Sequence, residues 1–351
     1  RLGYTFPPAF ALVKLAWIAK EQPELLARTA KFLHPADWLV GQLTGDFNVT
    51  DTSNALKSGV DLITGHWPDF IENKLGISLE KLPRIVRPGE QVGEVSKAAA
   101  AHTGLQQGTP VIAGASDGTA SFLASRASAV GDWNLTLGST IAIRGVSGEL
   151  VRDPQGRLYC HRHPEGWWLP GGASNCGGEA LTKTFDVARL AELDTAAQAR
   201  LESAPLVYPL VRQGERMPFV SGIAEGFVLG TPADEADLYA GYLLGLALVT
   251  AWSVEEAKVA GADVDGDFYL SGGGGKGLTL GRAMATALGR TLLRTEEAEA
   301  AMGVALLAAG WAWHSGSVSA AQRAMVRLEG SFEPYNKLQE FFTHRLEELK
   351  A

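Results

Sequence analysis

The order of apolar and polar positions predicts a chain of alternating helices and strands. Residues 10–18 place apolar side chains at helical spacing, and this helix should end near Pro23. Residues 35–43 predict a second helix, because a proline stands in the first turn and Gly45 follows the end. Residues 46–70 hold turn residues without a sustained period, so we expect a loop there.

The pattern changes at Gly131. Before it, residues 111–113 form a short apolar run and residues 118–126 a helical pattern, and this alternation indicates α/β architecture. After it, the strand-like segments 133–137 and 141–143 flank a tight turn, which predicts a hairpin.

Strands and helices continue to alternate, and we expect two domains, residues 1–128 and residues 129–351. Residues 238–259 are apolar nearly all round, which predicts a helix buried on every side. The other predicted elements are strands at 167–169, 268–270 and 291–293, and helices that start near Ser174 and cover 280–288, 299–313 and 335–349.

The composition excludes several classes of protein. With 39 acidic and 31 basic residues the net charge is −8, whereas a domain that binds nucleic acid through phosphates is usually basic. Two cysteines, Cys160 and Cys176, are too few for a disulfide framework and fit a reducing compartment. The sequence has no run of about eighteen apolar residues, the length of a membrane span. We therefore expect a cytoplasmic protein without nucleic-acid or membrane partners.

Residues 271–277, S-G-G-G-G-K-G, lie between a predicted strand and a predicted helix, where backbone N–H groups can approach a phosphate. The spacing does not fit a P-loop, because Leu270 stands where a glycine is required and Gly277 where a Ser or Thr is required. A dinucleotide fingerprint, a loop over the adenosine end of a nucleotide and a purely structural turn all remain compatible with these glycines.

Asp117 is a single carboxylate that follows the predicted strand at 111–113. Gly114, Ala115 and Gly118 have little or no side chain, so a small substrate would have space to approach the carboxylate. A carboxylate in this setting suits a general base, and it equally suits the N-cap of the following helix. The two roles are compatible.

Three further sites carry chemically capable side chains. The hairpin turn Gly138-Ser139-Thr140 combines two hydroxyls with exposed N–H groups, which suggests an oxyanion ligand. The segment 160–163 contains Cys and His, but no second cluster stands at zinc spacing, so we interpret it as a strand followed by a solvated loop. Glu215 and Arg216 predict an ion pair that locks a loop.

Taken together, the motifs resemble the FGGY family of carbohydrate kinases over essentially the whole chain after residue 8. They are A-D-W-L-V-G-Q-L-T-G (36–45), G-A-S-D-G (114–118), L-T-L-G-S-T (135–140), G-G-A-S-N-C-G-G (171–178), G-E-R-M-P-F (214–219), S-G-G-G-G-K-G (271–277) and E-A-A-M-G-V-A-L-L-A (299–308). Their joint order is more specific than any one of them. Several stretches look closest to the xylulose-kinase-like D-ribulokinases of plants and cyanobacteria: D-T-S-N-A-L-K-S-G-V-D (51–61), the pattern at 117–127, L-G-S-T-I-A-I (137–143) and P-G-G-A-S-N-C-G-G (170–178).

The resemblance implies two actin-like, ribonuclease-H-like ATPase domains with a cleft between them, the first domain incomplete at its N-terminus. It implies that Asp117 is the catalytic base in phosphoryl transfer from MgATP to the terminal hydroxyl of a ketopentose, in our interpretation D-ribulose. The residues it implies at the nucleotide are Gly138, Ser139, Thr140, Gly172, Cys176, Gly177, Gly272, Gly273, Gly274 and Gly277. ATP and Mg²⁺ follow as cofactors, and no residue is assigned to a metal.

The family's opening strand and its D-x-G-T phosphate turn are not found in this sequence, which begins without Met. We therefore expect either that the sequence is a fragment of a longer protein or that the chain by itself does not catalyse. Other interpretations stay open: a kinase for xylulose, L-ribulose or a polyol, and a catalytically dead nucleotide-binding module. The oligomeric state is open as well, with a homodimer as one option.

Overall fold

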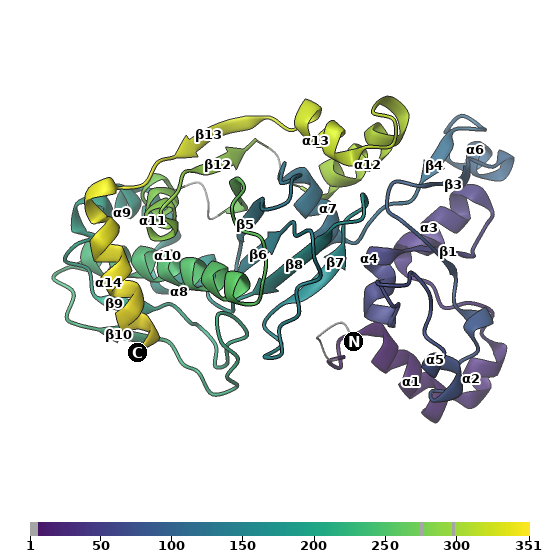
Figure 1. Ribbon diagram of the computed structural model, residues 1–351, viewed down its shortest axis with the longest axis horizontal. Helices are drawn as coiled ribbons and strands as arrows, with labels where there is room; N and C mark the ends of the chain where they lie inside the picture. The colour runs from purple at the N-terminus through teal and green to yellow at the C-terminus, as the bar shows by residue number, and fades with distance from the viewer. Residues whose placement is uncertain (1–5, 274–276, 297–298) are drawn as a thin grey trace. The chain divides into compact units, whose positions relative to one another are not determined.

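The computed structural model describes residues 6–273, 277–296 and 299–351 (Figure 1). Contacts between residues group the chain into two units, and each is described by itself. Unit 1 comprises Arg1–Ala124, His161–Trp167 and Glu299–Met325, and unit 2 comprises Ser125–Cys160, Trp168–Ala298 and Val326–Ala351. Both units therefore join segments that are far apart in the sequence.

Unit 1 consists of short helices and two small sheets. Strand β1 (Val49–Asp51) pairs in parallel with β2 (Arg84–Val86), and β3 (Gln91–Glu94) pairs in antiparallel with β4 (Pro110–Ile112). Its helices are α1 (Ala11–Glu21), α2 (Pro23–Arg28), α3 (Pro35–Thr44), α4 (Thr52–Ala55), α5 (Phe70–Asn73), α6 (Lys97–Thr103), α7 (Asp117–Ala124), α12 (Ala300–Trp313) and α13 (Val318–Met325), with 3-10 turns η1 (Leu56–Ser58) and η2 (Leu79–Lys81). The predicted helices at 10–18, 35–43, 118–126 and 299–313 and the strand at 111–113 are confirmed.

The loop predicted at 46–70 is wrong, because β1, α4 and η1 lie within it. Strand β1 forms only with a partner more than thirty residues away, and no local pattern reports that pairing. Helix α4 begins where the side chain of Asp51 accepts hydrogen bonds from the N–H groups of Ser53 and Asn54.

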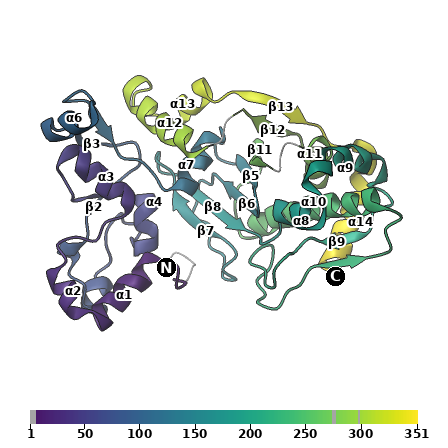
Figure 2. The ribbon, with the colours of Figure 1, turned by 180° about the vertical axis from the view of Figure 1, so that it is seen from behind.

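Helix α12 lies beside α7 in two opposite views of the molecule (Figures 1 and 2). Gly303 of α12 makes this approach possible, because a Cβ atom there would overlap the carbonyl oxygen of Ala120. The helix that begins with Asp117 is thus packed closely along its length, and its first turn is held in place by the rest of unit 1.

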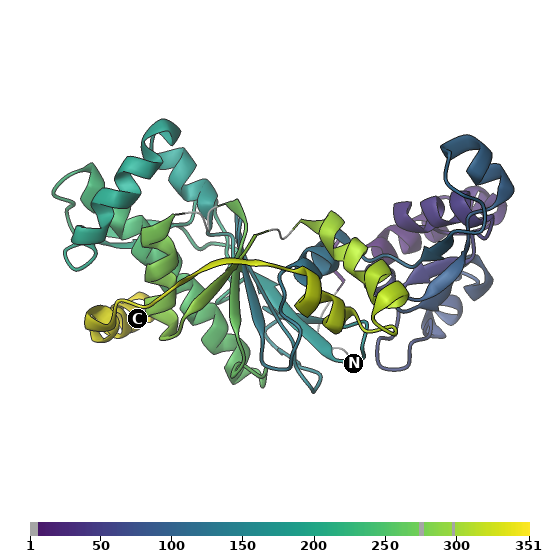
Figure 3. The same ribbon diagram turned by 90° about the horizontal axis from the view of Figure 1, so that it is seen from above.

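Unit 2 is built on a seven-stranded sheet with the strand order β13-β12-β11-β5-β6-β8-β7. The strands are β5 (Trp133–Leu137), β6 (Ile141–Gly145), β7 (Tyr159–Arg162), β8 (Trp168–Ala173), β11 (Phe268–Ser271), β12 (Leu292–Thr295) and β13 (Leu328–Phe332). The predicted β5–β6 hairpin and the strands at 167–169, 268–270 and 291–293 are confirmed. Figure 3 shows these strands nearly edge-on, with the green helices α10 and α11 on one face.

Unit 2 also contains several helices and a smaller sheet, and the longest of these helices is α10. They are α8 (Gly178–Thr184), α9 (Leu190–Ala197), α10 (Glu235–Val259), α11 (Leu278–Leu288) and α14 (Gln339–Lys350), the turns η3 (Val187–Arg189), η4 (Gln198–Arg200) and η6 (Asn336–Leu338), and the pair β9 (Leu206–Tyr208) and β10 (Phe227–Leu229). Helix α10 is apolar and long enough to cross a membrane, but 83% of its apolar window is buried inside the protein. It packs against α9, α11, α14 and β9, as expected for a core helix.

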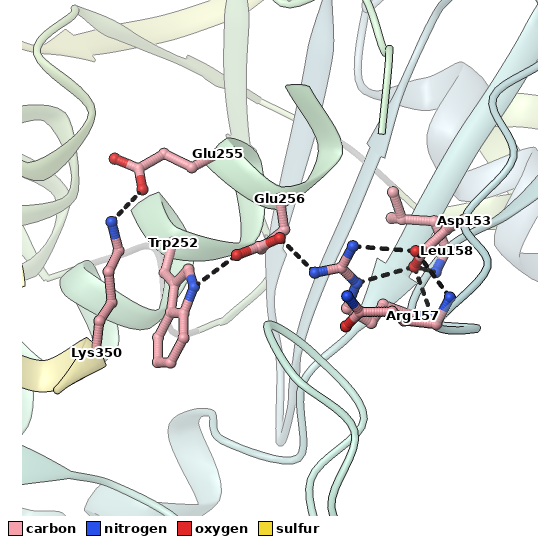
Figure 4. A network of polar contacts seen from close by, with 8 residues as sticks. Asp153, Arg157, Leu158, Trp252, Glu255, Glu256 and Lys350 are labelled. Carbon is pink, nitrogen blue, oxygen red and sulfur yellow. Dashed lines mark hydrogen bonds and ion pairs between the residues drawn. The ribbon is translucent and has the colours of Figure 1, made fainter. Parts of the chain in front are cut away.

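A buried ionic network ties α10 to the segment before β7 (Figure 4). The guanidinium of Arg157 donates to Asp153 at 3.0 Å and also pairs with Glu256 of α10. Asp153 is only 1% exposed, and Trp252 Nε1 donates to the other oxygen of Glu256 at 3.0 Å. Two oppositely charged groups are therefore removed from water together, each with hydrogen bonds that offset its desolvation.

Two local predictions in this part of the chain are only partly confirmed. The helix predicted from Ser174 begins four residues later, at Gly178, because residues 174–176 are bonded elsewhere. The segment 160–163 is a strand, as predicted, but no solvated loop follows it, since His163 is fully buried. The His163 ring lies 5.0 Å from that of Trp167, and burial lowers its pKa to about 4.

Candidate functional site

Two of the predicted glycine turns lie at the same edge of the sheet in unit 2. Strands β5 and β11 run in parallel, with Thr136 opposite Ser271, so the turns that follow them leave side by side. Gly272 has a φ of +89°, and a Cβ atom there would stand 2.6 Å from the carbonyl oxygen of Leu137. Only glycine fits at this position. Ligands of α/β folds bind at such carboxyl ends of parallel strands.

The turn Gly138-Ser139-Thr140 presents N–H groups to solvent. Gly138 N donates to the carbonyl of Thr140 at 3.1 Å, and Ser139 is exposed. Within the described part of the chain, the N–H groups of Ser139 and Thr140 donate no hydrogen bond to the protein. Adjacent unpaired N–H groups in a turn form a concave site of positive potential that suits a phosphate oxygen.

A third turn, at Gly177 and Gly178, rests directly on the first. Gly178 N donates to the carbonyl of Gly138 at 2.8 Å, and Ile141 N donates to the carbonyl of Cys176 at 2.7 Å. A Cβ atom at Gly177 would overlap the backbone of Ser139 and Thr140. The structure therefore brings together three of the predicted glycine turns, around Gly138, Gly177 and Gly272.

Gly172 and Cys176 contribute to this arrangement from inside the protein. Gly172 lies in β8, where a Cβ atom would stand 2.6 Å from the carbonyl oxygen of Arg157. The Cys176 side chain is completely buried, and burial together with the nearby charge of Glu215 raises the pKa of its thiol. Gly172 thus allows β8 to pack closely on the backbone at Arg157, and the buried Cys176 does not present its thiol to a ligand.

The glycine-rich loop after β11 is described at both of its ends. Gly273 has open space where a side chain would be, whereas a Cβ atom at Gly277 would stand 2.7 Å from Asp194 Oδ1. Asp194, on α9, accepts a hydrogen bond from Thr279 N at 3.0 Å and so caps α11. Gly274 lies outside the described residues. Sequence reasoning missed Asp194, because the contact joins positions 85 residues apart.

Asp117 is the first residue of α7 in unit 1, and its side chain is exposed. Its Oδ1 accepts a hydrogen bond from Gly118 N at 2.6 Å. The preceding residue is fixed from behind: Ser116 N donates to Ser53 Oγ at 2.7 Å, and Ser53 Oγ donates to buried Asp51 at 2.5 Å. Asp51 and Ser53 thus hold the segment that contains Asp117. Asp51 is also the N-cap of α4, and an Asp two residues before a Ser is the local sequence signal of that cap.

The backbone at Gly114, three residues before Asp117, has open space beside it. A Cβ atom at Gly114 would meet nothing closer than Val304, at 3.9 Å, which is an ordinary contact. Gly114 is therefore not required by packing, in contrast to Gly177 and Gly272. An exposed, anchored carboxylate beside small residues can accept a proton from a bound hydroxyl.

The ion pair predicted between Glu215 and Arg216 is wrong. The Arg216 side chain donates instead to the Asn175 side-chain oxygen at 2.8 Å, while Glu215 accepts the backbone N–H of Arg216 at 2.7 Å. Glu215 does lock a loop, as predicted, but through backbone N–H and hydroxyl groups. The reason is burial: the carboxylate faces donors of the protein interior, and the guanidinium reaches toward solvent.

Comparison with protein families agrees with these observations. Residues 1–124 match the N-terminal domain of the FGGY family of carbohydrate kinases, and residues 130–313 match its C-terminal domain. The chain belongs to the FGGY family. Its α/β architecture, with a large central sheet, is that of a two-domain FGGY kinase, as the sequence motifs predicted.

Individual relatives of this FGGY chain carry two activity names. It is 29% identical over 203 residues to a gluconokinase of Bacillus subtilis, covering 58% of this chain and 39% of the relative. It is 26% identical over 342 residues to a xylulose kinase of Bacillus subtilis, covering 93% and 67%. The crystal structure of a xylulose kinase from Rhodospirillum rubrum superposes with a TM-score of 0.89 at 26% identity, covering 100% and 73%. The FGGY chain is thus xylulose-kinase-like, and it spans well under half of the gluconokinase it matches.

Proposed function

We propose that this chain forms the nucleotide site and the catalytic base of an ATP-dependent ketopentose kinase. We also propose that its two domains are residues 1–128 and residues 129–351. One observation carries the proposal: three glycine turns pack on one another at the carboxyl edge of β5 and β11, with the N–H groups of Ser139 and Thr140 unpaired within the described chain. Such a backbone cradle binds phosphate without a charged side chain. Gly272, Gly273, Gly274 and Gly277 would lie along the nucleoside.

Asp117 would act as the general base. Its carboxylate accepts the proton of the terminal sugar hydroxyl as that oxygen bonds to the γ-phosphorus of ATP, and the bond from this phosphorus to the β–γ bridging oxygen breaks. ADP leaves with the electron pair, so atoms and charge balance. Phosphoryl transfer depends chiefly on positioning and charge neutralisation, and a positioned base contributes about 10²–10⁴-fold. Mg²⁺ would bind together with ATP, because phosphate oxygens and water supply most of the ligands of Mg²⁺ at such sites.

The proposed substrate is a ketopentose, in particular D-ribulose. Relatives named xylulose kinase cover most of the chain, which supports a five-carbon ketose. The choice of D-ribulose rests on the stretches 51–61, 117–127, 137–143 and 170–178, and xylulose, L-ribulose and a polyol remain competing substrates. A nucleotide-binding module without catalysis is the alternative of another class.

Turnover tests this proposal in the full-length protein. A coupled assay of ADP release should show stimulation by D-ribulose above the rate without sugar, and more strongly than by D-xylulose, L-ribulose or ribitol. The Asp117→Asn variant should lower kcat by about 10²–10⁴-fold while ATP still binds. Near-normal turnover in that variant would refute the role of Asp117.

Two controls separate the alternatives. ATP binding without stimulation by any sugar would favour the non-catalytic module. The 351-residue chain, which contains no D-x-G-T turn, should bind ATP in calorimetry without turning over sugar. Sugar-dependent ADP release by this chain alone would show that its expected inactivity is wrong.

A further inference from the structure

Glu215 is a buried carboxylate whose oxygens are saturated by protein donors. It lies between β9 and β10 and is only 3% exposed. Oε1 accepts the backbone N–H groups of Asn175 and Arg216, both at 2.7 Å. Oε2 accepts the hydroxyls of Ser174 at 2.7 Å and Tyr208 at 2.9 Å. In a buried setting, this many donors can replace the water that the carboxylate loses.

The donors on residues 174 and 175 belong to the segment that leads into the glycine turn at 177. Cys176 N donates to Ser174 Oγ at 2.9 Å, so the hydroxyl that reaches Glu215 also holds the next backbone N–H. The carbonyl of Cys176 then accepts Ile141 N at 2.7 Å. A continuous chain of hydrogen bonds therefore runs from Glu215 to the first residue after the turn 138–140.

The end of this chain is the phosphate cradle itself. Gly177 packs on the backbone of Ser139 and Thr140 too closely for any side chain, and Gly178 N donates to the carbonyl of Gly138. A displacement of residues 174–176 that lengthened the bond from Gly178 N to Gly138 beyond about 3.5 Å would break this contact. The turn 138–140 would then lose the backbone support that holds its two unpaired N–H groups in place.

We propose that Glu215 is a positioning residue for the nucleotide: its carboxylate fixes residues 174–178 against the turn 138–140 and thereby sets the affinity for ATP. This inference rests on the proposed function of the turn. Glu215 touches neither substrate nor reacting atoms, and it acts through Ser174, Asn175 and the glycine turn.

Two substitutions at position 215 should differ in effect. In Glu215→Ala, the N–H groups of Asn175 and Arg216 lose their acceptor inside the protein, at a cost that weakens binding of a non-hydrolysable ATP analogue by about tenfold or more. In Glu215→Gln, the amide oxygen can stay on these N–H groups, and its NH₂ can donate to the rotatable hydroxyls of Ser174 and Tyr208. This variant should retain affinity within about threefold.

The control removes a loop-holding carboxylate of the same unit that is exposed, whereas Glu215 is buried. Asp263 accepts Ser147 Oγ at 2.8 Å and Gly148 N at 3.1 Å, and it precedes β11, whereas the glycine turn follows β11. Asp263→Ala should lower the melting temperature without changing the dissociation constant of the analogue. Equal loss of affinity in Asp263→Ala and Glu215→Ala would overturn the inference, because it would indicate general destabilisation.

Hydrogen exchange in the protein without nucleotide tests the geometry even if the proposed nucleotide function fails. The amides of Ile141 and Gly178 should exchange at least about tenfold faster in Glu215→Ala than in the wild type, and at an unchanged rate in Asp263→Ala. If Glu215→Ala does not fold, Ser174→Ala takes its place. It removes one hydrogen bond of the chain and should make the same two amides exchange faster. Unchanged exchange in these variants would overturn the positioning role. Faster exchange with no binding of the analogue by the wild type would instead refute the nucleotide site.

Discussion

The glycine turns of unit 2 and the Asp117 segment of unit 1 are built in different ways. The turns are backbone packed on backbone, so that a methyl group at Gly177 or Gly272 would collide with the main chain of the neighbouring turn. The Asp117 segment has an exposed side chain and open space at Gly114, and it is anchored through Ser116 to Ser53. The glycine turns therefore have no space for an added methyl group, whereas the Asp117 segment has such space at Gly114.

This difference matches the two ligands that we propose. The phosphates of ATP present the same oxygens in every turnover, and a rigid set of N–H groups needs no reorganisation to bind them. A sugar hydroxyl must approach a carboxylate from solvent, and the exposure of Asp117 permits that approach. Rigidity should therefore determine nucleotide affinity, and anchoring of the Asp117 segment should determine turnover.

The largest effect should come from the ionic network of Asp153, Arg157 and Glu256 in unit 2. Arg157→Met removes the cation from Asp153 and Glu256, which should lower the unfolding free energy of unit 2 by about 3 kcal/mol, near the lower end for broken buried pairs. The lower end applies because Asp153 keeps backbone N–H donors from Gln155 and Leu158. Urea unfolding followed by tryptophan fluorescence measures the change.

An exposed arginine provides the control for this prediction. Arg189 pairs with Glu192 and Glu235 at the surface, so Arg189→Met should leave the urea midpoint unchanged within error. If Arg157→Met were as stable as Arg189→Met, the network would not support unit 2. Adding Asp153→Asn to Arg157→Met should recover part of the loss, because it removes the unpaired charge.

A pair of glycine substitutions compares the two regions directly. Gly177→Ala places a methyl group against the backbone of Ser139 and Thr140, and overpacking of about 1–3 kcal/mol corresponds to roughly 5- to 150-fold weaker binding of ATP. Gly114→Ala finds ordinary van der Waals space and should leave ATP affinity unchanged. Calorimetry on the two variants measures both. Equal affinities would contradict the view that only the glycine turns are tightly constrained.

The sequence predicted those parts of the fold that are encoded locally. The β5–β6 hairpin follows from alternating residues around a small turn, and α10 from an unbroken apolar run. The glycine turns, too, were identified from adjacent residues. Their mutual packing was not, because it depends on β5 and β11 lying side by side although they are separated by 130 residues of chain.

Sequence reasoning missed the hydrogen-bond partners of the carboxylates that hold the candidate site in place. Glu215 reaches back to Ser174, 41 residues earlier, and Asp194 reaches forward to Thr279, 85 residues later. The sequence around a carboxylate does not show whether the group is buried among backbone donors or exposed beside a basic side chain. Only the fold determines which donors surround it, and this explains why the neighbouring Arg216 suggested the wrong partner.

The smallest effect concerns the anchor of the Asp117 segment. Ser53→Ala removes the acceptor of Ser116 N and a donor to Asp51, at a cost of about 1 kcal/mol, so kcat should fall about fivefold while the ATP dissociation constant stays unchanged. Steady-state kinetics of the full-length protein measure the first and calorimetry the second. We expect kcat to change without the ATP dissociation constant because Ser53 and Asp117 belong to unit 1, whereas the proposed nucleotide turns belong to unit 2.

Ser96→Ala is the matched control for Ser53→Ala. Ser96 caps α6 of the same unit by accepting Ala99 N at 3.2 Å, so its loss should cost a similar amount of stability, about 1 kcal/mol, without affecting kcat. A fall in kcat of the same size in both variants would mean that turnover follows the overall stability of unit 1. A fall confined to Ser53→Ala would mean that the hydrogen bonds of Ser53, to Ser116 and to Asp51, hold the base in position, because Ser96 fixes a different backbone segment of the same unit.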